Sequence, residues 1–149
     1  MSRRGDDPAA LAETLRLLHG MGFHRWAGMP PPERAADGSV SVTIQAEGDA
    51  VMPFGGLHGG VLTGLYEFPA LAALLPELAP DEWAVTADIH ARNIGAVRTG
   101  EVVTITGRLV RRGRGIAFVE AEARVDDRLV GRASITKAIV PAPDALKPG

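Results

Sequence analysis

Residues 57–75 read LHGGVLTGLYEFPALAALL, and the fold that we predict is built around this stretch. From Val61 to Leu75 the side chains are apolar nearly all round, which is typical of a helix buried on most of its sides. Pro69 lies inside this helix and removes the amide that would bond to the Leu65 carbonyl, so we expect a kink or a break there. The sequence therefore predicts a buried, interrupted helix near the middle of the chain.

Strands are indicated on both sides of this helix. Residues 39–46 alternate apolar and polar side chains, as a half-buried strand does. Further segments rich in Val, Ile, Thr and Ala follow the helix at 83–94, 101–111, 116–125 and 128–140. Tight turns at 112–115 and 126–127 join the last three as an antiparallel meander. We predict an α+β fold in which the helix covers one face of an antiparallel sheet, with pairing between the sheet edges of two chains.

The 149 residues are typical of one domain. Near the N-terminus Asp7 is a good N-cap, Pro8 suits the first helical position, and glycines at 20 and 22 end a short helix. Three prolines at 30–32 indicate an extended connection. We divide the single domain into an N-terminal helix with its connection, a core and a tail, at residues 1–37, 38–140 and 141–149.

Charge and composition exclude several classes of protein. Sixteen Lys and Arg against eighteen Asp and Glu give a formal net charge of −2, which provides no basic surface for nucleic acid. The chain has no cysteine, the four histidines lack HExxH spacing, and no serine lies in a Gly-x-Ser-x-Gly turn. We therefore expect no metal site, no thiolate chemistry and no serine-hydrolase triad. With no export signal and no apolar run of the ~20 residues that span a membrane, we expect a soluble, cytoplasmic protein.

The glycines at the start of the buried helix are the first candidate for chemistry. Gly59 and Gly60 follow His58 at the helix N-terminus, where backbone amides have no partner within the helix and the helix dipole is positive. Such amides can form an oxyanion hole. The alternative is that these glycines only permit a tight turn. His58 is either a structural residue or a cap that orients the Gly59 amide.

Glu67 is the only charged residue in the apolar helix, and it shares a face with Gly60 and Thr63. A carboxylate on such a face is costly unless it is paired or used, and in such surroundings it can act as a base near neutral pH. The alternative is a glutamate on the helix surface that forms a salt bridge. The first reading makes Glu67 the candidate catalytic acid.

Three motifs together resemble a known family. They are His58-Gly59-Gly60 with the acid Glu67 nine residues after the histidine, Thr86-Ala87-Asp88-Ile89-His90, and the segments at 99–102 and 111–121. Over roughly residues 38–140 the chain resembles the hotdog-fold acyl-CoA thioesterases of the phenylacetic-acid-degradation (PaaI-like) type. The resemblance implies a long central helix wrapped by a curved antiparallel sheet of about five to six strands. It also implies a homodimer, or a dimer of dimers, with active sites at the subunit interface.

The resemblance implies hydrolysis of an acyl-CoA thioester to a free acid and CoA, with no cofactor apart from the CoA of the substrate. In the family, an amide at the position of Gly59 polarises the thioester carbonyl, and the acid at the position of Glu67 reaches in from the partner chain as nucleophile or as base. A hydroxyl at the position of Thr86 helps to place the attacking water. The candidate substrate-binding residues are Gly60, Tyr66, Arg112, Gly113 and Arg114.

Two positions depart from the family pattern. Met52 stands six residues before the histidine, where members commonly carry an asparagine, and its thioether has no hydrogen to donate. Pro69 follows the acid by two residues. Met52 keeps open the alternative of a protein that binds acyl-CoA with little or no catalysis. A dehydratase or hydratase of the same fold is a third and less favoured alternative, because those enzymes space their histidine and acid differently.

Overall fold

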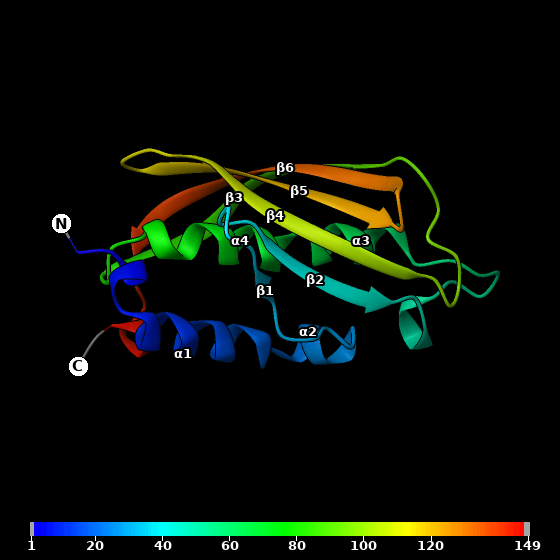
Figure 1. The fold of residues 1–149 in the computed structure, drawn as a ribbon, viewed down its shortest axis with the longest axis horizontal. Coiled ribbons are helices and arrows are strands. Elements are labelled where there is room, and N and C mark those ends of the chain that lie inside the picture. The colour runs from blue at the N-terminus through cyan, green and yellow to red at the C-terminus, as the bar shows by residue number, and fades with distance from the viewer. Residues whose placement is uncertain (1, 148–149) are drawn as a thin grey trace.

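A computed structural model describes residues 2–147, in which a curved antiparallel sheet lies over a central helix (Figure 1). The six strands are β1 (Glu33–Arg34), β2 (Val40–Gln45), β3 (Glu82–Asn93), β4 (Val102–Arg112), β5 (Ile116–Val125) and β6 (Arg128–Pro141). Their spatial order is β1-β2-β4-β5-β6-β3. Alternating buried and exposed residues in β2, β4, β5 and β6 show that one face of the sheet rests on the core. The hotdog arrangement expected from the resemblance is confirmed.

The predicted meander is also confirmed, because β4, β5 and β6 pair in antiparallel order through two tight turns. Asp126 occupies the second turn with a φ of 51°. β3 then returns to pair with β6, with Thr86 opposite Lys137. Within residues 2–147 the other side of β3 has no partner strand, so β3 is an edge of the sheet.

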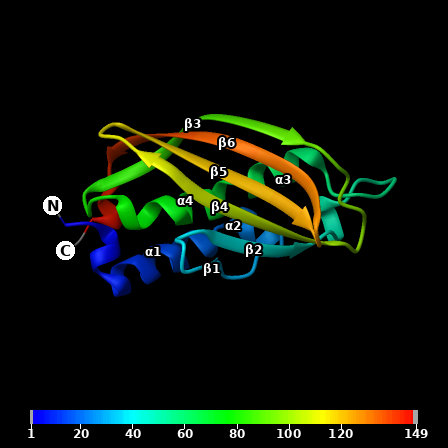
Figure 2. The same cartoon turned by 45° about the horizontal axis from the view of Figure 1, so that its top comes forward.

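The central helix is interrupted as expected, but at Tyr66, three positions before Pro69, which itself lies inside the second segment. It consists of α3 (Gly59–Leu65) and α4 (Glu67–Leu74), separated by Tyr66 and followed by a 3₁₀ turn (Leu75–Glu77). Tyr66 keeps helical backbone angles of φ −62° and ψ −28°, so α4 continues from α3 beneath the sheet (Figure 2). The break adjoins Leu65, whose carbonyl has lost the Pro69 amide as its partner.

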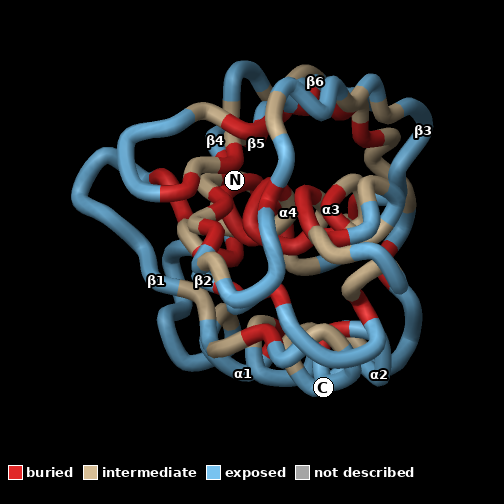
Figure 3. Tube along the Cα trace, turned by 90° about the vertical axis from the view of Figure 1, so that its right-hand side faces the viewer, coloured by how far each residue is buried: buried red, intermediate tan, exposed pale blue. Residues whose placement is uncertain are grey.

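Two glycines of the sheet let the central helix approach closely. A Cβ atom on Gly107 of β4 would overlap the backbone of Pro69 and Ala70. A Cβ atom on Gly131 of β6 would overlap the Tyr66 hydroxyl group. The core lies between sheet and helix, as the largely buried trace of α4 shows (Figure 3). Its largest fully buried side chains include Leu65, Tyr66, Leu74, Leu75, Leu78, Ile105 and Ile135.

The N-terminal segment forms a third layer, on the side of the central helix away from the sheet (Figures 1 and 3). The predicted cap of α1 (Pro8–His19) is confirmed, because Asp7 Oδ1 accepts hydrogen bonds from the amides of Ala9 and Ala10 at 3.1 and 3.0 Å. A short helix that was not predicted, α2 (Gly22–Trp26), follows. Its residue Phe23 packs against Gly64 of α3.

The remaining short elements are 3₁₀ turns at Arg4–Asp6, Gly48–Ala50 and Asp144–Leu146. β1 was not predicted, since it holds only two residues of the expected connection and pairs with β2. Residue 1 and the last two residues of the expected tail lie outside the described residues. No helix within residues 2–147 is both long and apolar enough to cross a membrane.

Candidate active site

Three polar side chains from three elements meet at the inner face of the sheet, close to its β3 edge. Thr86 Oγ1 lies 2.9 Å from Glu67 Oε1 and 2.8 Å from Oε2. Lys137 Nζ donates to Thr86 Oγ1 at 2.7 Å and forms an ion pair with Glu67. Since an ammonium group only donates, the Thr86 oxygen accepts from Lys137 and gives its single hydrogen to the carboxylate. The direction of every hydrogen bond in this network is thereby set.

Strand register and a bulge bring these residues together. Thr86 and Lys137 are directly opposite in the β3–β6 ladder, and Glu67 is the first residue of α4. The register shifts between Thr86 and Asp88, so Ala87 is an extra residue in β3. This bulge allows Thr86 and Ile89, three positions apart, both to face the helix.

Lys137 was missed in the sequence, although β6 carries a signal for it. Residues two apart on a strand share a face, and Ala133 and Ile135 are apolar and buried. Lys137 continues this row and its side chain is 3% exposed. A lysine on the apolar face of a strand needs a partner of opposite charge.

The structure corrects the expected environment of Glu67. The sequence predicted a buried acid that is paired or used, but the side chain is 30% exposed and is paired with a lysine. The salt-bridge alternative is therefore the one observed, with the difference that the cation is buried. Thr86, the residue expected to help place a water molecule, directs its hydroxyl group at the carboxylate.

The start of α3 has one free amide. Of the two roles considered for His58, the structure shows the cap, but on Gly60 and not Gly59: its Nδ1 accepts from the Gly60 amide at 3.0 Å, and its carbonyl accepts from Val61 and Leu62. The Gly59 amide has no acceptor within residues 2–147. A Cβ atom on Gly60 would lie 2.9 Å from His58 Cε1, so the cap needs glycine at that position. The free amide points out of the positive end of the helix dipole.

The free amide and the acid are not adjacent in one chain. Eight residues separate Gly59 from Glu67 along α3 and α4, which corresponds to ~12 Å at 1.5 Å per helical residue. A thioester carbonyl is too small to contact both groups of the same chain. Within one chain, the structure thus joins Glu67 with Thr86, and His58 with Gly59 and Gly60, as two separate groups.

Comparison with known proteins identifies the family. The profile of the thioesterase superfamily matches residues 54–132, more than half of the chain, a range that contains Gly59, Glu67 and Thr86 but not Lys137. This protein belongs to the thioesterase superfamily. No curated protein matches the sequence.

Solved structures of other proteins, some of them named as thioesterases, share the fold. The chain is 25% identical to the thioesterase HI1161 from Haemophilus influenzae, with a TM-score of 0.77 over 87% of this chain and 90% of that one. It is 27% identical to the conserved protein PA5202 from Pseudomonas aeruginosa, with a TM-score of 0.73 over 84% and 98% of the two chains. A hypothetical thioesterase with coenzyme A from Streptococcus pneumoniae TIGR4 is 23% identical, with a TM-score of 0.66 over 76% of this chain and 87% of that one.

In this superfamily member, the remaining candidates form no side-chain hydrogen bond or ion pair with either group within residues 2–147. Arg112 is half-buried and paired with Glu82, and Gly113 closes the β4–β5 turn by donating to the Ile116 carbonyl at 2.7 Å. Arg114 is exposed at that turn. Tyr66 is fully buried in the core, and its hydroxyl group has no hydrogen-bond partner among the described residues. This burial raises the pKa of Tyr66 to about 12.

Two further residues, Met52 and Asn93, lie in the segments around the helix start. Met52 lies in the turn before α3, where its amide donates to the Gly56 carbonyl at 2.9 Å. Asn93, which was not predicted, donates from Nδ2 to the Gly59 carbonyl at 3.4 Å. A side-chain amide therefore does stand next to Gly59, although it comes from the end of β3 and not from position 52.

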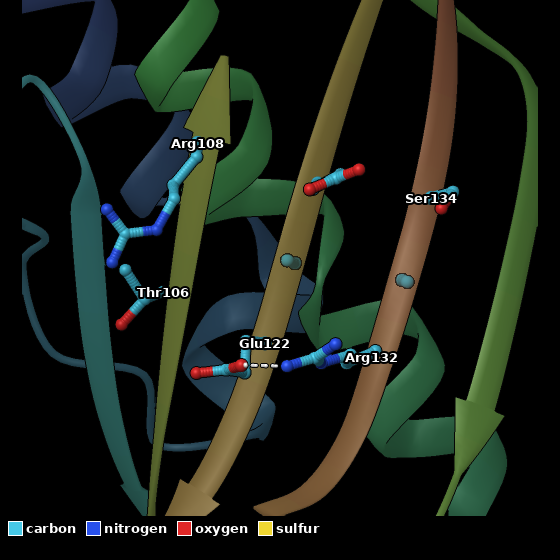
Figure 4. Close-up of a pocket in the computed structure, with 8 residues that line it drawn as sticks. Thr106, Arg108, Glu122, Arg132 and Ser134 are labelled. Carbon is cyan, nitrogen blue, oxygen red and sulfur yellow. Dashed lines mark hydrogen bonds and ion pairs between the residues drawn. The ribbon is translucent and has the colours of Figure 1, made fainter. Parts of the chain in front are cut away.

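A polar depression on the opposite face of the sheet belongs to neither group. It is lined by outward-facing side chains of β4, β5 and β6, among them Arg108, Glu122 and Arg132 (Figure 4). Glu122 pairs there with Arg132 at 3.1 Å. No group of three or more His, Asp or Glu side chains placed to hold a metal ion occurs in the described part of the chain.

Proposed function

We propose that this protein hydrolyses acyl-CoA thioesters, as a hotdog thioesterase of the PaaI-like type. The observation that carries the proposal is the pair of groups on one interrupted helix: the free Gly59 amide at its start, and the Glu67 carboxylate held by Thr86. Membership of the thioesterase superfamily supports the reaction class. The solved structure with coenzyme A from Streptococcus pneumoniae supports CoA as the carrier of the acyl group.

The active site in this proposal forms between two copies of the chain. The ~12 Å between Gly59 and Glu67 in one chain is bridged when two central helices lie antiparallel, so that Gly59 of one copy faces Glu67 of the other. The unpaired edge of β3 lies beside this helix face and offers backbone groups to a second copy. A homodimer, or a dimer of dimers, is the assembly that we propose.

The chemistry uses groups that the chain supplies. The Gly59 amide donates a hydrogen bond to the carbonyl oxygen and stabilises the negative charge that develops there. Glu67 either removes a proton from water, whose oxygen then attacks the carbonyl carbon, or attacks that carbon itself and is released by water. In both routes the carbon–sulfur bond breaks, the CoA thiolate takes a proton, and one water is consumed. The exposed Arg114 at the β4–β5 turn is our candidate for a CoA phosphate, since Arg112 is already paired with Glu82.

A second candidate function is acyl-CoA binding without hydrolysis. Met52 provides no side-chain hydrogen bond, and the charge of Glu67 is balanced by Lys137. Saturable binding of acyl-CoA, with no thiol released above the uncatalysed rate, would establish this alternative.

The experiment is a thiol-release screen over short, medium, long and aryl acyl-CoA substrates with wild type and Glu67→Gln. Glutamine keeps one acceptor oxygen at this position, whereas Glu67→Ala would leave the buried ammonium group with no side-chain partner at position 67 and confuse loss of chemistry with loss of folding. The matched control is Glu33→Gln, an exposed glutamate in β1. We expect only Glu67→Gln to lose turnover; undiminished turnover in a folded Glu67→Gln protein would refute the role of the acid.

A further inference from the structure

One of the two lysines of the chain is buried beside the candidate catalytic acid. The Lys137 side chain is 3% exposed, whereas that of Lys147 is 48% exposed. A buried ammonium group is costly unless it is both paired and hydrogen-bonded. Glu67 supplies the opposite charge, and Thr86 Oγ1 supplies a second acceptor at 2.7 Å.

The two carboxylate oxygens of Glu67 differ in their hydrogen-bond partners. Oε2 faces the Lys137 ammonium group, and Oε1 does not. The Thr86 hydroxyl group, whose single hydrogen is shared between oxygens 2.9 and 2.8 Å away, is the only other donor to either oxygen within residues 2–147. Oε1 consequently retains lone pairs that no described group occupies. The Glu67 side chain as a whole is 30% exposed, so it is not sealed from solvent as that of Lys137 is.

We propose that Lys137 is a positioning residue for thioester hydrolysis, an inference that rests on the proposed role of Glu67. Lys137 holds Oε2 and the Thr86 oxygen at the same time, so neither the carboxylate nor the hydroxyl group is free to rotate. The other oxygen, Oε1, is thereby directed at the substrate carbonyl or at the attacking water. Lys137 itself does not touch the substrate, because it is covered on all sides.

The first test compares kcat and KM for thiol release in Lys137→Met and Lys147→Met. Methionine is close to lysine in length and has an apolar stem, but it carries no charge and no N–H donor. We expect Lys137→Met to lower kcat by about 100-fold, as misplacement of a catalytic group does, with KM nearly unchanged. Lys147→Met, at an exposed site near the C-terminus, is expected to match the wild type.

The second test is chemical rescue of Lys137→Ala, which a merely structural role would not predict. The truncated side chain leaves room for ethylammonium, whose N–H groups can reach both Glu67 and Thr86. Tetramethylammonium has the same charge but no N–H group, and it serves as the matched salt. We expect kcat to rise with ethylammonium concentration and to stay low with tetramethylammonium.

The outcomes separate this inference from the proposed function. If folded Lys137→Met keeps the kcat of the wild type, the inference is overturned and the proposed function stands. If Lys137→Met folds poorly, the rescue of Lys137→Ala by the two salts decides, because both salts act on the same folded fraction of that variant. Equal effects of ethylammonium and tetramethylammonium on kcat would overturn the inference. If the wild type releases thiol from no substrate of the panel, the proposed function is overturned instead.

Discussion

Lys137 and Glu67 form an ion pair although 70 residues separate them in the sequence. The pair joins β6 to the first residue of α4, and the Thr86 hydroxyl group is hydrogen-bonded to both partners. Packing of the helix on the sheet and alignment of the candidate catalytic acid therefore depend on the same contact. Substitutions at these positions affect stability and activity together, and the variants below are chosen to separate the two.

The ion pair itself predicts a marked difference between single and double variants. Glu67→Ala leaves a buried ammonium group unpaired, so we expect the free energy of unfolding to fall by about 3 kcal/mol. Adding Lys137→Met to Glu67→Ala removes the unpaired charge and recovers much of this loss. Urea unfolding of the wild type, both single variants and the double variant measures the coupling. Additive effects of the two substitutions would show that the pair is not formed.

The Gly59 amide can be removed with little change to the backbone. Proline is well tolerated at the first helical position, and His58, at φ −61° and ψ 127°, already has the extended conformation that a following proline requires. We expect Gly59→Pro to fold and to lose about 100-fold or more in kcat, as removal of an oxyanion-hole donor does. Gly59→Ala is the control, because it keeps the amide and disturbs only the flexible Asn93 side chain.

A mixture of inactive variants tests whether two copies share the site. Unfolding and refolding Gly59→Pro together with Glu67→Gln produces mixed dimers, in which one of the two sites has both an intact amide and an intact acid. We expect part of the wild-type activity to return on mixing. Activity that stays absent, although mixed dimers are detected by mass spectrometry, would contradict a site formed between copies.

Gly107 predicts a severe effect from the smallest possible side chain. A methyl group there would overlap the backbone of Pro69 and Ala70, which cannot move aside as a side chain can. We expect Gly107→Ala to lower the free energy of unfolding by about 3 kcal/mol or more. Gly115→Ala, in the β4–β5 turn with nothing within 4 Å of the new methyl group, should change it little. Thermal unfolding of both variants checks the comparison, and similar Tm values would disprove it.

Tyr66 predicts an increase in stability from removal of a polar atom. Its hydroxyl group is buried without a hydrogen-bond partner in the described chain, which is unfavourable by about 1–3 kcal/mol relative to a satisfied group. We expect Tyr66→Phe to raise the free energy of unfolding by about 1 kcal/mol. A loss of stability would mean that the hydroxyl group has a partner in the assembled protein.

His24 predicts that stability falls in mild acid. The ring is buried against Phe68, with centroids 4.6 Å apart, and its Nδ1 donates to the Leu18 carbonyl at 2.6 Å. Burial lowers the pKa of His24 below 6.5, and the nearby His19 adds to this, while the bond to Leu18 opposes it.

The unfolded chain consequently binds a proton at position 24 more readily than the folded one. Below about pH 6.5 the free energy of unfolding should therefore decrease as the pH falls, until the folded state is protonated as well. Tm measured from pH 8 to pH 5 should show a flatter profile in His24→Phe than in the wild type. Identical slopes would exclude His24 as the source.

Much of the fold was predictable because its signals are local. The alternation of residues 39–46, the turn residues at 126–127 and the cap at Asp7 each act within a few positions, and all were observed as expected. α2 and β1 were missed for the opposite reason. Each is short and weak by itself, and contacts with distant segments hold it: Phe23 lies on Gly64, and β1 pairs with β2.

The sequence by itself determined where the candidate chemistry lies on the central helix: a glycine amide at its N-terminus, Gly59, and a single carboxylate, Glu67. Only the tertiary structure decided what surrounds that acid. The alternation of β6 turns Lys137 toward the core, but its partner depends on the β3–β6 register and on how α4 packs over the sheet. Charge balance in a protein interior is set by distances between segments, and these are established by folding of the whole chain.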